Sequence, residues 1–225
     1  MPAESVRLER CRRASIRRPV RRAGFIAGAA LAGLIGASVW WRRNPSACPY
    51  SQRFWVEAPH PFITRKRLLE ILEPAPGERI LEIGPGTGYY SLPVAERLSP
   101  GGTLEIFDLQ QEMLDHTMRR AGERALDNLV PRQGDAERLP YPDGSFDAAF
   151  LVTVLGEIPD QSKALAELAR VLRQGGRLVV GELFGDPHMV RFGALRERAE
   201  RAGLRFDRRL GGALGYFARF ESPAA

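Results

Sequence analysis

The sequence predicts a doubly wound α/β fold, in which a mostly parallel β-sheet carries helices on both faces. Three observations support this prediction. Apolar strands alternate with helices from about residue 65 onward, the connections between them are short, and acidic residues recur at or near the ends of successive strands. Ligands bind such sheets at the carboxyl ends of the strands, so the sequence also predicts a single crevice that gathers these acids.

The first predicted strand runs directly into a turn with three alternating glycines, Leu81-Glu82-Ile83-Gly84-Pro85-Gly86-Thr87-Gly88. Glycine tolerates positive φ and has no Cβ, so we expect a ligand to approach the amides of Gly84, Gly86 and Gly88 at the entrance to the next helix. A dinucleotide-binding fingerprint needs a small residue where this chain has Tyr89, which disfavours a pyrophosphate ligand. A plain strand-to-helix connection remains the alternative.

The second predicted strand, Thr103–Asp108, ends in an acid about 20 residues beyond the glycines. At that spacing a carboxylate can accept hydrogen bonds from both hydroxyls of a ribose, so Asp108 is a candidate ribose ligand. The alternative role is a cap for the predicted helix Gln111–Arg124, and the two roles are compatible. Leu109 follows directly and is expected to pack on the base attached to that ribose.

Two motifs of the sequence resemble those of a known family. The pattern E-x-G-x-G-x-G, from Glu82 to Gly88, resembles the first motif of class I S-adenosylmethionine-dependent methyltransferases, whose loop wraps the amino acid end of the cofactor. The segment Gln133–Pro140 resembles the family's G-D-A-x-x-L-P segment. This resemblance implies that Asp135 accepts the adenine amino group and that the amide of Ala136 meets a ring nitrogen. It also implies the remaining cofactor contacts, which are Glu82, Gly84, Pro85, Gly86, Gly88 and Leu151.

The later elements complete the pattern of the ubiquinone- and menaquinone-type methyltransferases, and the resemblance extends from about Arg65 to Phe220. It implies that the last two strands form an antiparallel edge hairpin in a seven-stranded sheet of order 3-2-1-4-5-7-6. In chain order we predict the turn Pro142–Ser145, strand Phe146–Val152, helix Gln161–Leu172, cap Gln174–Gly176, and strands Arg177–Glu182, Leu204–Leu210 and Gly215–Glu221.

An uncharged apolar run, residues 23–41, precedes the predicted domain. Its length suffices for a helix that crosses a bilayer, and Trp40 and Trp41 stand where an aromatic belt would lie, just before two arginines. We expect an N-terminal signal-anchor. The run is rich in Gly and Ala, so an interfacial helix, a cleavable signal peptide and a buried packing helix are alternatives, although the tryptophans and arginines disfavour cleavage.

We therefore divide the chain into a basic segment (1–22), a transmembrane or interfacial helix (23–41), a linker and lid (42–64) and one catalytic domain (65–225). Eight arginines precede the run, so the positive-inside rule puts the N-terminus in the cytoplasm and the domain outside. S-adenosylmethionine is kept in the cytosol, however. We expect the domain to face the cytoplasm, with the run either inserted the other way or lying on anionic headgroups.

The net charge of +6 does not by itself indicate a nucleic-acid ligand, because the arginines are concentrated in the basic segment and on predicted surface helices. No basic patch is interleaved with aromatic residues. Enzymes that methylate amino groups of nucleic acids carry Asn/Asp-Pro-Pro-Tyr after the fourth strand, where this chain has Leu151–Val154. Cys11 and Cys48 are expected to be free thiols, and the three histidines predict no metal site.

Few catalytic residues are expected, because the main contribution of a methyltransferase is to align the acceptor and to exclude water. Many quinone-methylating relatives carry a histidine in a segment like L-E-H-I-P-D, and here Leu155–Asp160 has Glu157 instead. Glu157 is a candidate base if desolvation raises its pKa, and otherwise a helix-start cap or a surface charge. His60 and His188 lie in predicted loops that flank the site and are further candidates.

Together these features predict a membrane-associated S-adenosylmethionine-dependent methyltransferase with a small lipophilic acceptor, such as a quinone precursor or a lipid headgroup. The choice of acceptor rests on analogy and on the position of the apolar run. The alternatives are a non-catalytic S-adenosylmethionine-binding protein and, less favoured, a nicotinamide-dependent reductase. No sequence feature predicts the oligomeric state.

Overall fold

The computed structural model describes residues 47–52 and 61–223. The chain divides into two compact units, Met1–Arg43 and Asn44–Ala225, and the described residues belong to the second. The predicted apolar helix 23–41 and His60 lie outside the described residues. Within the described part of the chain, no helix combines the length and the apolar character needed to cross a bilayer.

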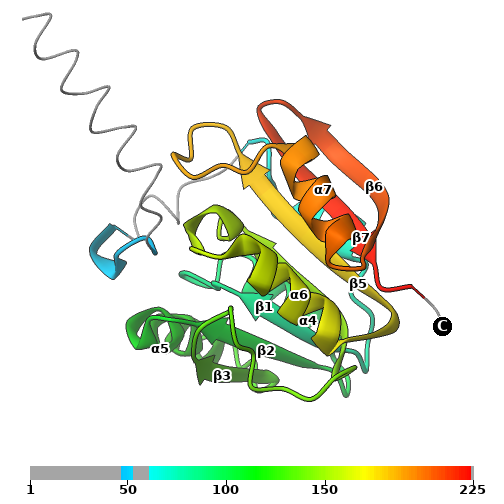
Figure 1. The fold of residues 1–225 in the computed structure, drawn as a ribbon. Helices are drawn as coiled ribbons and strands as arrows, with labels where there is room; N and C mark the ends of the chain where they lie inside the picture. The colour runs from blue at the N-terminus through cyan, green and yellow to red at the C-terminus, as the bar shows by residue number, and fades with distance from the viewer. Residues whose placement is uncertain (1–46, 53–60, 224–225) are drawn as a thin grey trace, which may run out of the picture. The chain divides into compact units, whose positions relative to one another are not determined.

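A seven-stranded sheet forms the centre of the second unit (Figure 1), in the order β3-β2-β1-β4-β5-β7-β6. Neighbouring strands from β3 to β5 pair in parallel, whereas β7 pairs antiparallel with both β5 and β6. The predicted fold class and strand order are confirmed. The strands are β1 (Arg79–Ile83), β2 (Thr103–Asp108), β3 (Leu129–Gln133), β4 (Phe146–Val152), β5 (Leu172–Leu183), β6 (Arg205–Gly212) and β7 (Gly215–Glu221).

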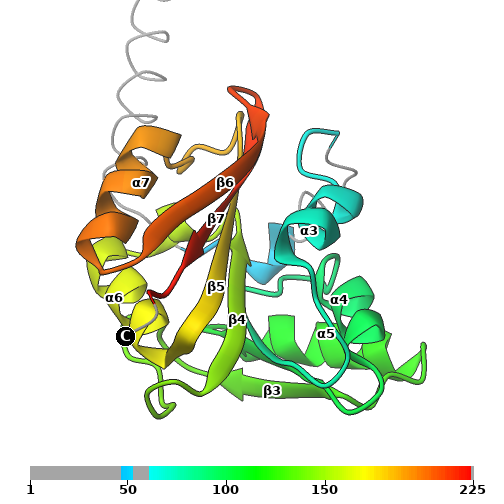
Figure 2. The same cartoon turned by 90° about the vertical axis from the view of Figure 1, so that its right-hand side faces the viewer.

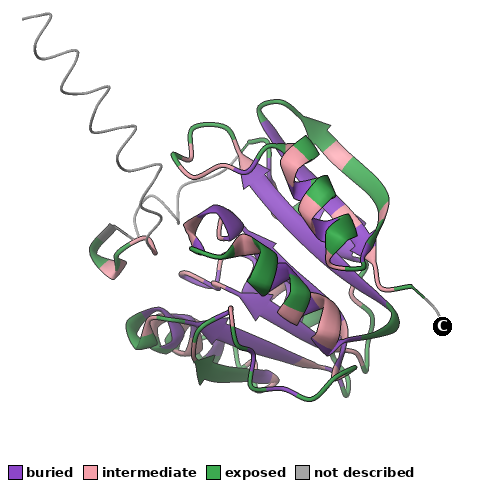
Figure 3. Ribbon diagram, viewed as in Figure 1, coloured by how far each residue is buried: buried purple, intermediate pink, exposed green. Residues whose placement is uncertain are grey.

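Helices cover both faces of this sheet (Figure 2). One face carries α3 (Arg65–Leu72), α4 (Ser91–Leu98) and α5 (Gln111–Gly122), and the other carries α6 (Gln161–Val171) and α7 (Phe192–Arg201). The central strands are buried on both faces and the edge strands β3 and β6 are largely exposed (Figure 3). This two-sided burial explains why the central strands are apolar runs rather than alternating patterns.

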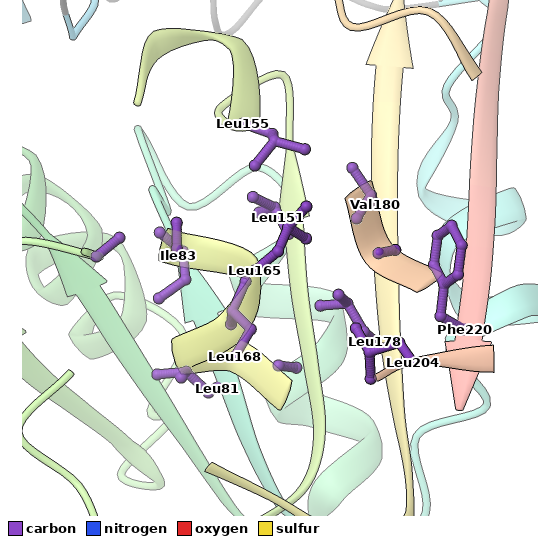
Figure 4. Close-up of a cluster of buried hydrophobic side chains, with 14 of the residues drawn as sticks. Leu81, Ile83, Leu151, Leu155, Leu165, Leu168, Leu178, Val180, Leu204 and Phe220 are labelled. Carbon is purple, nitrogen blue, oxygen red and sulfur yellow. The ribbon is translucent and has the colours of Figure 1, made fainter. Parts of the chain in front are cut away.

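The alternation of side chains along each strand divides the core into two clusters. In β1, Ile80 packs on the side of α3, α4 and α5, whereas Leu81 and Ile83 face α6. Figure 4 shows the second cluster, in which Leu165 and Leu168 of α6 meet residues of β1, β4 and β5. The two clusters hold the strands in one register, so the ends of β1, β2 and β4 lie together.

The predicted cap Gln174–Gly176 between helix and strand is wrong. Leu172, directly after α6, is already extended, and β5 begins there. The amide of Gly175 donates to the carbonyl of Ser222, and the amide of Ser222 donates to that of Gly176. The glycines therefore form an irregular start of β5 that pairs with the residue after β7, which satisfies backbone groups that a simple cap would leave to water.

Candidate active site

A cavity of about 360 Å³ lies at the carboxyl ends of β1, β2 and β4. Its size falls within the range of sites for small molecules. Much of the cavity lining is apolar and comes from the ends of these strands and the loops after them. Seven of the residues singled out in the sequence line this cavity: Gly84, Gly86, Asp108, Leu109, Asp135, Ala136 and Glu157.

The glycine-rich loop needs its glycines for their backbone conformation and, at two positions, for close packing. All three have positive φ, between 55° and 79°. A Cβ on Gly84 would overlap the side chain of Val154, and one on Gly88 would lie 3.1 Å from Cγ2 of Thr117. The amides of Gly84 and Gly88 already donate to the carbonyls of Phe107 and Pro85, at 2.8 and 2.9 Å. Contrary to expectation, these two amides donate hydrogen bonds within the protein and are not available to a ligand. Gly84 contributes only its accessible backbone surface to the cavity.

Asp108 does not cap the following helix. Its Oδ1 accepts a hydrogen bond of 2.8 Å from the amide of Gln110, which shapes the turn between β2 and α5, while α5 begins without a side-chain cap. Burial raises the pKa of Asp108 to about 6. A carboxylate at the rim of an apolar cavity, partly desolvated and oriented by its own turn, is suited to accept hydrogen bonds from ligand hydroxyls.

Glu82 lies behind the cavity rather than in its lining. Its side chain is 2% exposed, and burial together with the charge of Asp108 raises the pKa of Glu82 to about 8. The pKa of Glu82 is higher in the folded than in the unfolded state. At a pH between these two pKa values, the folded protein keeps the proton that the unfolded chain loses. Folding stability should therefore fall as the pH rises from the unfolded value of 4.5 toward 8.

Replacing Glu82 with Gln removes this titration. We expect the wild type to lose up to about 1.4 kcal/mol of unfolding free energy per pH unit relative to Glu82→Gln across that interval. Urea denaturation of both proteins at several pH values measures the difference, and the subtraction cancels the other buried acids. Unfolding free energies that run parallel with pH would contradict the assignment.

Glu157 is the last residue of a short 3₁₀ helix, η2 (Leu155–Glu157), and its carboxylate lines the cavity. It is not the helix-start cap, because Asp160 fills that role with a 3.0 Å hydrogen bond from the amide of Lys163. Burial, with smaller contributions from Asp186 and Asp108, raises the pKa of Glu157 to about 7. One oxygen, Oε2, accepts a 3.1 Å hydrogen bond from the amide of Cys48.

Residues 81–180, which contain the glycine-rich loop, Asp108, Asp135 and Glu157, match the family model for a methyltransferase domain. The chain carries a methyltransferase domain. This fold and this domain are typical of S-adenosylmethionine-dependent enzymes.

Two curated relatives and one solved structure illustrate the likeness. Nocamycin O-methyltransferase of Saccharothrix syringae is 37% identical over 113 residues, which cover 50% of this chain and 40% of the relative. Demethylmenaquinone methyltransferase of Thermus thermophilus is 42% identical over 130 residues, 57% of either protein. The crystal structure of a SAM-dependent methyltransferase from Aquifex aeolicus shares the fold, with a TM-score of 0.72, 19% identity, and coverage of 78% of this chain and 100% of that one. The chain spans about half the length of the curated relatives it matches.

The charge of the cavity in the methyltransferase domain fits a cofactor that carries a sulfonium and an ammonium group. Asp108, Asp135 and Glu157 line it, and none of its described lining residues is Lys, Arg or His. A Cβ at Gly134, also in the lining, would overlap the ring of Phe107, so glycine is needed there for the close packing of that ring. Thr153 has φ 56°, a strained conformation for a β-branched residue, and also lies in the lining.

Other predicted residues of the methyltransferase domain do not line the cavity. Leu151 is fully buried in the cluster of Figure 4, because strand alternation turns it toward α6, and Val152 reaches the cavity instead. Pro85 and Gly88 hold the shape of the loop, because the amide of Gly88 donates to the carbonyl of Pro85. His188 lies in the β5–α7 connection, where its amide donates to Asp186 at 2.7 Å and its carbonyl packs against Gly156.

Sequence reasoning missed one wall of the cavity. Ala47 and Cys48 line it, although they lie far from the other lining residues in the sequence. The segment 47–52 is held by Glu157 and by Gln110, whose Nε2 donates to the carbonyl of Cys48 at 2.9 Å and whose Oε1 accepts from the amide of Tyr50 at 3.2 Å. No local pattern marks Cys48, but Gln110, one residue beyond Leu109, could have been found by extending the motif.

Proposed function

We propose that this chain is an S-adenosylmethionine-dependent methyltransferase that acts on a small lipophilic acceptor. The observation that carries the proposal is one cavity in which the glycine-rich loop, Asp108 and Asp135 meet Glu157. Cofactor-binding residues and a candidate base thus share one space. The relatives named above support methyl transfer, and their names refer to an O-methyltransferase and to a demethylmenaquinone methyltransferase.

Each cofactor contact has a separate role in this proposal. Asp108 accepts hydrogen bonds from the ribose hydroxyls, Asp135 and Ala136 meet the adenine edge, and Leu109 packs on its face. When bound, S-adenosylmethionine supplies an electrophilic methyl group on positively charged sulfur. The carboxylates of the lining offset that charge in a partly desolvated site, where electrostatic interactions are stronger than in water.

Glu157 serves as the general base in this proposal. A pKa of about 7 leaves the free carboxyl group about half ionised near neutral pH, which suits it to take a proton from a hydroxyl or enol acceptor during transfer. The hydrogen bond from the amide of Cys48 fixes one carboxylate oxygen and so orients the other. Ala47 and Cys48 help to exclude water from the same part of the cavity.

The lining around Glu157 supports an apolar, uncharged acceptor. Val154, Ile158 and Pro159 adjoin it in the cavity wall, and the described lining offers no cation to pair with an acceptor's phosphate or carboxylate. A quinone precursor meets these requirements better than an acidic metabolite. We further propose that residues 23–41 hold the chain at a membrane, where such an acceptor accumulates, with the domain facing the cytoplasm.

Calorimetric titration of the full-length chain with S-adenosylmethionine and, separately, NADH tests the cofactor. Asp108→Ala should weaken S-adenosylmethionine binding about ten- to hundredfold, or about 1.5–3 kcal/mol, because two hydrogen bonds to a charged group are lost. Asp115→Ala is the matched control. Asp115 is an exposed aspartate on α5 that accepts a hydrogen bond from Gln111.

Equal affinities in wild type and Asp108→Ala would refute the ribose assignment. Binding of NADH in place of S-adenosylmethionine would favour the reductase alternative. Tight S-adenosylmethionine binding without methyl transfer to any compound of a lipid extract would favour a non-catalytic binding protein.

A further inference from the structure

Three of the five large hydrophobic side chains that are exposed in the described part of the chain gather at one end of the sheet. Phe62 is 40% exposed, Phe184 67% and Leu214 49%. The amide of Phe184 donates to the carbonyl of Leu214 at 3.1 Å, and a Cβ on Gly215 would lie 2.7 Å from Cβ of Phe62. We call these three residues the apolar rim.

The apolar rim comes from three separate loops. Phe62 precedes α3, Phe184 begins the β5–α7 connection, and Leu214 lies in the turn between β6 and β7. In Figure 2 these loops lie at the same, upper end of the sheet. This apolar surface comes from three loop tips, whereas the other two exposed large hydrophobic residues of the described chain lie apart, Leu109 in the cavity lining and Val130 on the edge strand β3.

The charges around the apolar rim are mostly positive. The segments 61–67, 183–191 and 209–217 contain five Lys or Arg residues and a single acid, Asp186. Arg67 is tied directly to the rim, because its Nη1 donates to the carbonyl of Phe62 at 2.7 Å. Lys66, Arg191 and Arg209 are exposed. Exposed aromatic and leucine side chains bordered by cations are complementary to an anionic bilayer, whose interface takes up the apolar groups and whose headgroups attract the cations.

The apolar rim is linked to the cavity wall through one connection of the chain. The β5–α7 connection that begins with Phe184 continues to His188, whose carbonyl packs so closely on Gly156 that no Cβ would fit there. Gly156 belongs to η2, and the next residue is Glu157 in the cavity lining. One connection therefore forms part of the rim and supports the wall that carries the candidate base.

We propose that the apolar rim docks the folded domain onto an anionic lipid surface and presents the Glu157 side of the cavity to it. This contact is additional to any contact made by residues 23–41. This proposal deepens the proposed function. It rests on the proposed function only in assuming that the acceptor comes from the membrane. The docking itself needs no acceptor and is tested without one.

An environment-sensitive fluorophore on the rim tests the contact. The full-length chain with Cys11→Ser and Cys48→Ser receives one cysteine, as Phe184→Cys or Leu214→Cys, and a nitrobenzoxadiazole label. Val130→Cys is the matched control, because Val130 is 41% exposed but lies on the opposite edge strand. Each protein is reconstituted with vesicles of phosphatidylcholine alone, or of phosphatidylcholine and phosphatidylglycerol in equal parts.

With the anionic vesicles, labels at positions 184 and 214 should shift to the blue and gain several-fold in emission, and high salt should reverse much of the change. The label at position 130 should respond little. Equal responses at 130 and 184 would overturn the docking surface, and equal responses to the two kinds of vesicle would overturn the choice of an anionic partner. Each labelled protein is also titrated with S-adenosylhomocysteine, and its affinity should be the same for all three label positions. Failure of docking can therefore be told apart from failure of the proposed function.

Discussion

Glu157→Gln is expected to lower the turnover rate about 10²–10⁴-fold while S-adenosylmethionine affinity changes little. Glutamine keeps the shape of the side chain and can still accept the hydrogen bond from the amide of Cys48, but it cannot take a proton. The large loss follows if the acceptor must be deprotonated during transfer. Single-turnover kinetics with a methyl-accepting fraction of a lipid extract measure the chemical step directly.

Glu182→Gln is the matched control for this substitution. Glu182 is buried, burial raises its pKa to about 8, and its Oε2 accepts a 3.0 Å hydrogen bond from the amide of Val190. It does not line the cavity. A rate loss confined to Glu157→Gln supports the base, whereas similar losses in both variants would assign the effect to a general change in buried charge.

The pH profile of the same reaction gives an independent check. A base works only when deprotonated, so kcat/KM should rise with pH and level off above the pKa of Glu157 in the free enzyme, about 7. The positive charge of the bound cofactor favours the carboxylate, so the corresponding rise in kcat should lie at lower pH. A profile that is flat across this range in the wild type would contradict the assignment.

Gly86→Val is expected to reduce S-adenosylmethionine affinity by more than the roughly hundredfold upper figure for Asp108→Ala. Gly86 lines the cavity with φ 55°, a backbone conformation that a β-branched residue adopts only under strain. The added methyl groups would also occupy the space in front of the loop. Calorimetric titration measures the loss, and circular dichroism checks the fold.

Gly144→Val separates strain from obstruction. Gly144 also has positive φ, 66°, but lies in the turn before β4, away from the cavity, with the nearest atom to its Cβ position 3.8 Å away. We expect this variant to lose some stability and to retain cofactor affinity. If both variants lose affinity equally, the effect comes from backbone strain and the proposed path of the cofactor is wrong.

The fold class and the gathering of candidate cofactor residues in one cavity were predictable because their signals are local, whereas the strand order was implied by the family resemblance. The glycine-rich loop follows β1 directly, Asp108 ends β2 and Asp135 lies two residues after β3, and the winding of the sheet brings strand ends together. Leu151 shows the limit of this reasoning. A strand buried on both faces has no polar alternation, so the sequence does not reveal whether Leu151 or Val152 points into the cavity.

Contacts between distant parts of the chain were not predictable. The hydrogen bond from Cys48 to Glu157 joins residues 109 positions apart, and neither belongs to a periodic pattern. Burial raises the pKa of Glu157, and the hydrogen bond from Cys48 offsets part of that rise, so the sequence could present the residue only as a candidate. The apolar rim likewise gathers three loops that are unremarkable one by one and meaningful only when the sheet places them together.

The close contact between Gly84 and Val154 bears on how acceptor preference could be redesigned. The absence of a side chain at Gly84 lets Val154 rest directly on the glycine-rich loop, so under the proposed function the donor and acceptor sides of the cavity meet at this contact. Replacements at either residue would alter the donor-to-base geometry and the acceptor space at once. Ile158 and Pro159 lie in the same lining and take no part in this contact, so under the proposed function we expect substitutions there to change the acceptor space without disturbing the glycine-rich loop.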